Sequence, residues 1–146
     1  MLIHVQNRQR SVKVPLAWLR RFAEVALPEC ALHSADGRFA LQKLSEIEVA
    51  VVSDRIIARV HQRFMKIPGP TDVITFEHGE IVMSAETART HAARYRHTVD
   101  VELALYLVHG LLHLNGYEDA RRNDAIQMKK TQARIMKACL ERISTP

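Results

Sequence analysis

The alternation of hydrophobic and polar residues along the chain predicts several short β-strands. The clearest is 46–52 (EIEVAVV), in which Ile, Val and Val recur at every second position, the period of a strand with one buried face. Shorter patterns of the same kind predict strand segments at 3–5 and 12–14. The segments 71–76 (TDVITF) and 80–83 (EIVM) are separated by a few turn residues, which predicts a β-hairpin.

Apolar residues at helical spacing predict five helices. Pro15 can open the first of them, and Pro28 is expected to end it. Ser53 and Ser84 are expected N-caps of the next two. The segment 99–115 is apolar almost all round, which predicts a buried central helix. A last amphipathic helix closes the chain, and its expected inner face consists of Ile126, Ala133, Met136, Leu140 and Ile143.

A strand–helix–strand unit, a hairpin and terminal helices together predict an α+β (α/β-like) fold. We expect a small mixed sheet that packs around the buried central helix. The chain has 146 residues, the size of one ordinary domain, so residues 1–146 are expected to form a single domain. With 47% hydrophobic and 25% charged residues, the composition excludes a disordered or repetitive protein.

The sequence also indicates the cellular compartment in which we expect the protein. The longest apolar stretch, 103–114, is shorter than a membrane span and contains two histidines. The N-terminus lacks the pattern of a secretory signal, so we expect a cytoplasmic protein that does not bind membranes. Cys30 and Cys139 are far apart and in no C-x-x-C pair, which excludes a disulfide scaffold and a thiolate zinc site.

The arginine content raises the expectation of a nucleic-acid partner, although charge alone fits an ordinary solvated surface better. The net charge is +5, and fifteen of the 21 basic residues are arginine, whose planar guanidinium suits phosphate groups and stacks on bases. Arg55, Arg59 and Arg63 recur every four residues opposite the apolar side of their predicted helix, with Lys66 just beyond. These four residues are candidate RNA-binding residues; a solvated helix face is the alternative interpretation.

The segment 109–119 (HGLLHLNGYED) carries the candidate chemistry. His109 and His113 are four residues apart, so on a helix both imidazoles can reach one metal ion. The helix is expected to end at Gly116, and the following turn allows Asp119 to supply a third ligand. Three protein ligands leave one position open, the arrangement of a catalytic zinc site. The alternative for Asp119 is an N-cap of the last helix.

The spacing of this segment also resembles the metzincin protease pattern. In those enzymes the residue after the first histidine is the glutamate that acts as general base, and this chain has Gly110 there. A conventional zinc-protease mechanism is therefore disfavoured.

The motif HGLLHLNGYED resembles the HGxLHLxGYDH signature of the YbeY family. The members of this family are single-strand-specific, metal-dependent endoribonucleases of ribosomal RNA maturation and ribosome quality control. TDVITF resembles that family's TDVLSF strand, and 79–84 (GEIVMS) resembles its GDIxIS segment. The resemblance implies a mixed four-stranded sheet, one divalent ion, zinc, at His109, His113 and the position of Asp119, and ribosomal RNA or ribosomal subunits rather than DNA as partner.

The chain departs from the family pattern in two places. Asp119 stands where the family usually has a third histidine, and Glu118, which replaces the preceding Asp, is a possible substitute ligand. A carboxylate can bind zinc, but its negative charge makes the ion a weaker acid. Met65 stands where the family often has an arginine, so a phosphate or catalytic contact is missing or moved.

We therefore interpret the sequence as that of a metal-dependent endoribonuclease. Two alternatives stay open: a metalloprotease-like metal hydrolase, and a non-catalytic RNA-binding protein of ribosome assembly. No side chain is an unambiguous general base. Glu102 and Tyr106 precede His109 on the same predicted helix and are candidates to support the ligands, although a helix-dipole position for Glu102 and a core position for Tyr106 are slightly preferred.

Overall fold

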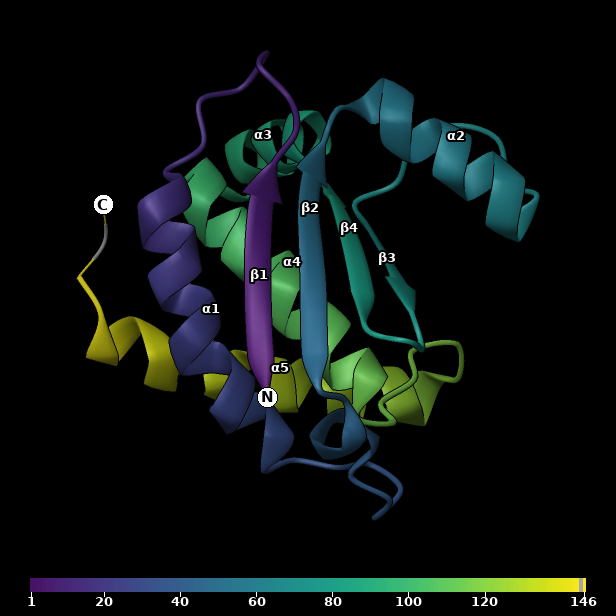
Figure 1. Ribbon diagram of the computed structural model, residues 1–146, viewed down its shortest axis with the longest axis vertical. Helices are drawn as coiled ribbons and strands as arrows, with labels where there is room; N and C mark the ends of the chain where they lie inside the picture. The colour runs from purple at the N-terminus through teal and green to yellow at the C-terminus, as the bar shows by residue number, and fades with distance from the viewer. Residues whose placement is uncertain (145) are drawn as a thin grey trace.

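The computed structural model describes residues 1–144 and Pro146 (Figure 1). Its strands are β1 (Leu2–Asn7), β2 (Glu46–Val52), β3 (Val73–Phe76) and β4 (Glu80–Ser84). Its helices are α1 (Leu16–Ala31), the short 3₁₀ helix η1 (Ala40–Lys43), α2 (Asp54–Met65), α3 (Ala85–Tyr95), α4 (Val99–Leu114) and α5 (Arg122–Arg142). The predicted α+β class with a mixed four-stranded sheet is confirmed.

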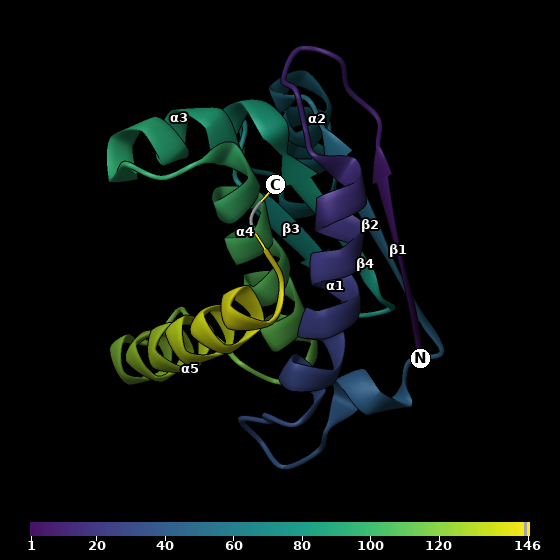
Figure 2. The same cartoon turned by 90° about the vertical axis from the view of Figure 1, so that its left-hand side faces the viewer.

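The sheet has the strand order β1-β2-β4-β3. The pairs β1–β2 and β2–β4 are parallel, whereas β3 pairs antiparallel with β4 through the predicted hairpin. Figure 2 shows α1 and α4 on one side of the sheet, with α5 packed beyond them. The helix α2 packs on the opposite face, over a small second cluster that includes Ile57 and Ile74. Since β3 is an edge strand, one side of its backbone is free of strand partners.

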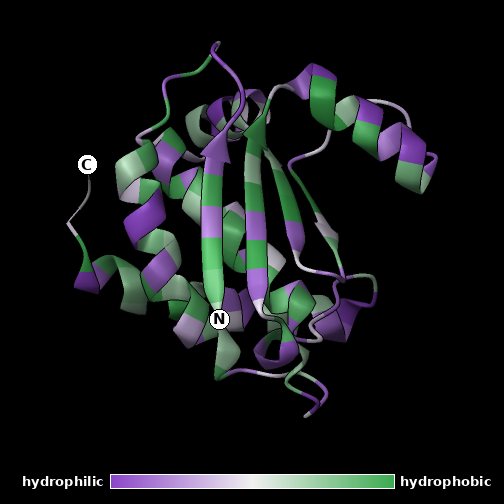
Figure 3. Ribbon diagram, in the orientation of Figure 1, coloured by the Kyte–Doolittle hydropathy of each residue, from purple (hydrophilic) through white to green (hydrophobic). Residues whose placement is uncertain are grey.

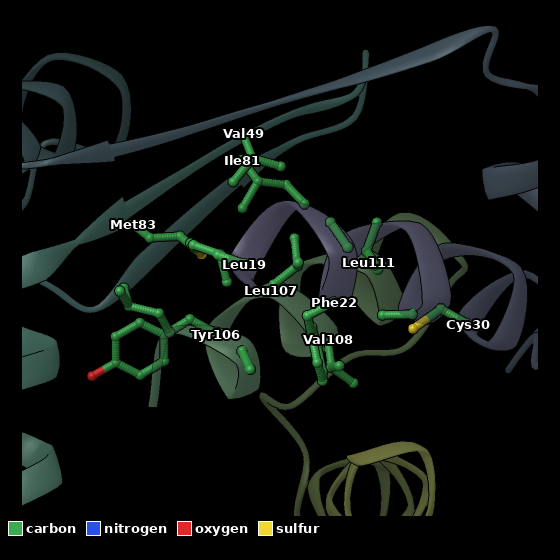
Figure 4. Close-up of a cluster of buried hydrophobic side chains, with 14 of the residues drawn as sticks. Leu19, Phe22, Cys30, Val49, Ile81, Met83, Tyr106, Leu107, Val108 and Leu111 are labelled. Atoms are coloured by element: carbon green, nitrogen blue, oxygen red, sulfur yellow. The ribbon is translucent and has the colours of Figure 1, made fainter. Parts of the chain in front are cut away.

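The core forms where α1 and α4 meet the inner face of the sheet. Leu107 and Leu111 of α4 lie against Phe22 of α1 and against Val49 and Ile81 of the sheet (Figure 4). Figure 3 shows hydrophilic and hydrophobic bands alternating along β1, as expected for a strand with one buried face. The prediction that 99–115 forms the buried central helix is therefore confirmed, with its last helical residue at Leu114.

The two predicted serine caps are confirmed. Ser53 accepts a hydrogen bond from the backbone N–H of Ile56, and Ser84 accepts one from that of Thr87. These caps fix where α2 and α3 leave the parallel strands. No helix in the described part of the chain combines the length and the apolar character that crossing a membrane requires.

Three local predictions are wrong. Val12 and Val14 are not in a strand, because the side chain of Gln9 binds both backbone groups of Val12 in place of a strand partner. Pro28 lies inside α1, whose last turn is held by the burial of Cys30 and Ala31.

The predicted inner face of α5 is right only in its second half. Met136 is buried, and Leu140 and Ile143 pack against the core, whereas Ile126 and Ala133 are exposed. The buried side of α5 consists of Met128, Thr131, Ile135, Met136 and Cys139.

Candidate metal centre

The last two turns of α4 bring His109 and His113 together at the edge of the core. Both side chains are about one-quarter exposed, whereas Leu111 and Leu112 between them are fully buried. The Nε2 atoms of the two histidines are 3.0 Å apart. The spacing of four residues therefore has the predicted geometric result: two imidazole nitrogens point to one place in a partly open site.

The turn after α4 is set by Asn115 and Gly116. The buried Asn115 side chain donates to the carbonyl oxygens of Cys30 and His33 and accepts from the N–H of Leu41, which fixes the helix end against α1 and η1. Gly116 has φ of +95°, and a Cβ there would lie 2.8 Å from Cγ of Asp36. A residue with a side chain would thus be strained at this position, and the reversal of the chain depends on glycine.

This reversal carries Asp119 back to the two histidines. Oδ2 of Asp119 lies 3.4 Å from Nε2 of His109 and 3.6 Å from Nε2 of His113. The N-cap residue of α5 is Arg121 and the helix has no side-chain cap, so the alternative role of Asp119 as an N-cap is wrong. Glu118 lines the same cleft, but it does not belong to the group of converging ligand atoms, which consists of His109, His113 and Asp119.

The other ring nitrogens determine the tautomers of both histidines. Nδ1 of His113 donates to the backbone carbonyl of Tyr117 at 2.8 Å, and Nδ1 of His109 donates to Oε1 of Gln132 at 2.9 Å. In a neutral imidazole a proton on Nδ1 leaves Nε2 with a lone pair that can bind a metal ion. A metal ion placed among the three atoms would accept a lone pair from each of them.

The spacing of the three atoms fits a divalent metal ion. Ligand atoms about 2.0–2.2 Å from a tetrahedral zinc ion are separated from one another by about 3.3–3.6 Å. The observed separations of 3.0, 3.4 and 3.6 Å lie close to that range. Neutral imidazole and carboxylate are also the donor types that zinc accepts in catalytic sites. The His–His–Asp group can therefore hold a metal ion.

Burial keeps His109 in the form that a metal needs. Desolvation lowers the pKa of His109 below its usual value, and the neighbouring His113 lowers it further, while the hydrogen bond to Gln132 and the charge of Asp119 act in the opposite direction. The net shift is downward, so at neutral pH His109 is unprotonated and its Nε2 is available as a ligand.

The ligands open into an acidic cleft of about 480 Å³. Four carboxylate residues line it beside the two histidines: Asp72, Glu77, Glu118 and Asp119. Met65, at the end of α2, also lines it, and no Lys or Arg of the described residues does. The carboxylates in the cleft would repel an anionic substrate, and a bound cation would reduce this repulsion.

The four candidate RNA-binding residues lie outside this cleft. Arg55, Arg59 and Arg63 are exposed along α2, and Lys66 is exposed just after it. Of the residues of α2, only Met65 at its end lines the cleft.

Glu102 and Tyr106 do not contact the ligands. Oε1 of the buried Glu102 is 2.7 Å from Nε2 of His97, and the buried Tyr106 hydroxyl is 2.9 Å from Nδ1 of His91. The residues that orient the ligands are Gln132 and the backbone of Tyr117. The sequence contains no local signal for Gln132, because it lies 23 residues from His109 and reaches it only through the packing of α5 on α4.

Gly110 allows α4 to lie directly on the sheet. A Cβ at this position would come within 3.0–3.2 Å of Ile81 and of the Thr75 hydroxyl. A glutamate side chain cannot occupy this position without displacing α4 from the sheet, so the metzincin-like general base is excluded by packing as well as by sequence.

We expect Gly110→Ala to destabilise the fold by about 1–3 kcal/mol through overpacking, although alanine favours helix formation by about 1 kcal/mol. Urea unfolding measures this difference, with Ala133→Gly at an exposed position of α5 as a control for the propensity term alone. A Gly110→Ala variant as stable as the parent or more stable would show that α4 does not need this close contact.

Comparisons with known proteins agree with the geometry. A family model described as Endoribonuclease YbeY matches residues 4–140. The Endoribonuclease YbeY of Micrococcus luteus is 33% identical over 135 residues, covering 82% of this chain and 85% of that protein. The Endoribonuclease YbeY of Nocardia farcinica is 32% identical over 124 residues, covering 72% and 67%. A protein of Thermotoga maritima, solved in solution, shares the fold with a TM-score of 0.62 at 23% identity, covering 96% of this chain and 90% of that one.

Proposed function

The chain belongs to the endoribonuclease YbeY family, and we propose that it hydrolyses single-stranded RNA with one divalent ion, zinc, held by His109, His113 and Asp119. We propose ribosomal RNA or ribosomal subunits as its target, in the cytoplasm, with roles in RNA maturation and ribosome quality control. Residues 1–146 would act as a single domain, and DNA would not be a substrate.

The observation that carries this proposal is the convergence of three potential ligand atoms. Nε2 of His109, Nε2 of His113 and Oδ2 of Asp119 lie within 4.8 Å of one another, and Gln132 and Tyr117 hold both imidazoles in the tautomer that a metal requires. Hydrogen bonds from the other ring nitrogen orient metal-binding histidines in this way in known metal sites.

A divalent ion at these ligands would supply a Lewis acid that stabilises negative charge on a phosphoryl oxygen or on an attacking water. The chain's own residues have three other tasks. Gln132 and Tyr117 keep the imidazoles oriented, and the acidic cleft repels phosphates from an ion-free site. Arg55, Arg59, Arg63 and Lys66 would contact phosphates outside the cleft, with a salt dependence typical of counterion release.

Cleavage assays with and without a chelator test this function against its two alternatives. We expect the purified protein to cut a labelled single-stranded RNA and to leave a duplex of the same sequence largely intact. Cleavage should stop when a chelator removes the ion. Casein serves as the protein substrate in a parallel assay. Hydrolysis of casein instead of RNA would favour a metalloprotease, and RNA binding without cleavage in any metal would favour an assembly factor.

A further inference from the structure

A row of aromatic and cationic side chains lies where α2 meets the β3–β4 hairpin. The rings of Phe64 and Phe76 are 5.2 Å apart in an edge-on arrangement, and the ring of His78 stacks on Phe76 at 5.7 Å. Cζ of Arg63 lies over the ring of Phe64, 5.3 Å from its centroid. The helix α2 and the β3–β4 hairpin thus bring together three rings and the planar guanidinium of Arg63.

Packing explains only part of this row. Phe76 packs against the small cluster beneath α2, so its ring has a structural role. Phe64, in contrast, is 58% exposed, and the side chain of His78 is 70% exposed. Exposed rings next to Arg63 and Lys66 combine flat apolar faces with positive charge, which is the chemistry that binds unpaired bases and their phosphates. An apolar protein segment would not require the cations.

The row borders the metal cleft along the edge of the sheet. Glu77, between Phe76 and His78 in the chain, lines the cleft together with His109, and Met65, next to Phe64, lines it from the side of α2. On β3, Phe76 is two residues from Ile74 of the outer cluster, whereas Thr75 reaches Gly110 of α4 on the inner side. The row is therefore on the outer face and the ligands on the inner side, with only the edge strand between them.

We propose that Arg63, Phe64, Phe76 and His78 form a stacking platform for unpaired bases of the RNA substrate, an inference that rests on the proposed function. Bases stack on the platform, their phosphates lie near Arg63 and Lys66, and the strand passes over the edge of β3 into the cleft. In a duplex the bases are stacked on one another and cannot lie on these rings, so the platform would select single strands.

Binding of a single-stranded decamer with 2′-O-methyl riboses, titrated against metal-loaded protein, tests the platform. Fluorescence anisotropy measures the Kd, and a gel confirms afterwards that the decamer is intact. We expect Phe64→Leu, which keeps an apolar contact with Phe76, to weaken binding about tenfold, and Phe64→Tyr to retain it. The matched control is Tyr95→Leu: Tyr95 is 61% exposed at the end of α3, which projects away from the sheet in Figure 2. This control should change the Kd by less than about twofold.

The outcomes separate the platform from the nuclease function. A parent protein that does not bind the decamer, or a folded Phe64→Leu variant that binds it as the parent does, overturns the platform. Equal losses of affinity for the decamer in Phe64→Leu and Tyr95→Leu also overturn the platform, because the loss would then not depend on the position of the ring. Metal-dependent RNA cleavage by the parent is measured separately, and its absence would refute the proposed function whatever the binding data show.

Discussion

Replacement of both His109 and His113 by alanine is expected to abolish RNA hydrolysis. The two side chains supply two of the three converging ligand atoms, and Asp119 alone cannot hold an ion against water. The rate should fall by at least about 100-fold, the effect of removing a single charge-stabilising donor in other hydrolases. Cleavage of single-stranded RNA at saturating metal measures the loss.

A His33→Ala/His61→Ala variant is the matched control. It removes two histidines that lie outside both groups of possible metal ligands and outside the cleft, and it should keep the parent rate. Circular dichroism establishes that both double variants are folded. A folded His109→Ala/His113→Ala variant that cleaves RNA at the parent rate would show that the activity does not depend on this centre.

Asp119→Ala is expected to weaken metal binding by about 100-fold or more, because one of three protein ligands is lost. Metal-free stability should change by less than about 0.5 kcal/mol, since Asp119 is half-exposed and does not cap α5. Asp119→His should restore or improve metal affinity and cleavage relative to Asp119→Ala, because an imidazole is a good ligand for zinc. Asp119→Ser should remain as weak as the alanine variant.

Metal titration and metal-free thermal unfolding of the three Asp119 variants decide the assignment. An Asp119→Ala variant with the metal affinity of the parent would refute the role of Asp119 as ligand. Glu118, which lines the same cleft, would then be the next candidate.

The convergence of His109, His113 and Asp119 could be predicted from the sequence because it depends on local geometry. His109 and His113 are one helical turn apart, and Gly116 follows the helix at the position where a left-handed residue ends it. The fold class followed from similarly local patterns, such as the alternation in β2 and the serine caps of α2 and α3. Each of these features is determined by residues within one or two turns of the site.

The features that could not be predicted depend on contacts between distant segments. Gln132 reaches His109 only because α5 packs across α4. Pro28 is tolerated in α1 because its neighbours are buried, and Gln9 replaces a strand partner for Val12. The row of Arg63, Phe64, Phe76 and His78 also joins two elements. Phe76 and His78 lie twelve or more residues after Phe64 in the chain, so no local sequence pattern brings these rings together.

If His109, His113 and Asp119 hold a catalytic ion, the metal content of the purified protein must depend on the two histidines. Inductively coupled plasma mass spectrometry of the parent and of the His109→Ala/His113→Ala variant gives the ratio of each metal to protein. The expected result is close to one divalent ion per chain in the parent and almost none in the variant. A parent that takes up no divalent ion when zinc is supplied, or a variant that keeps a stoichiometric ion, would contradict the account.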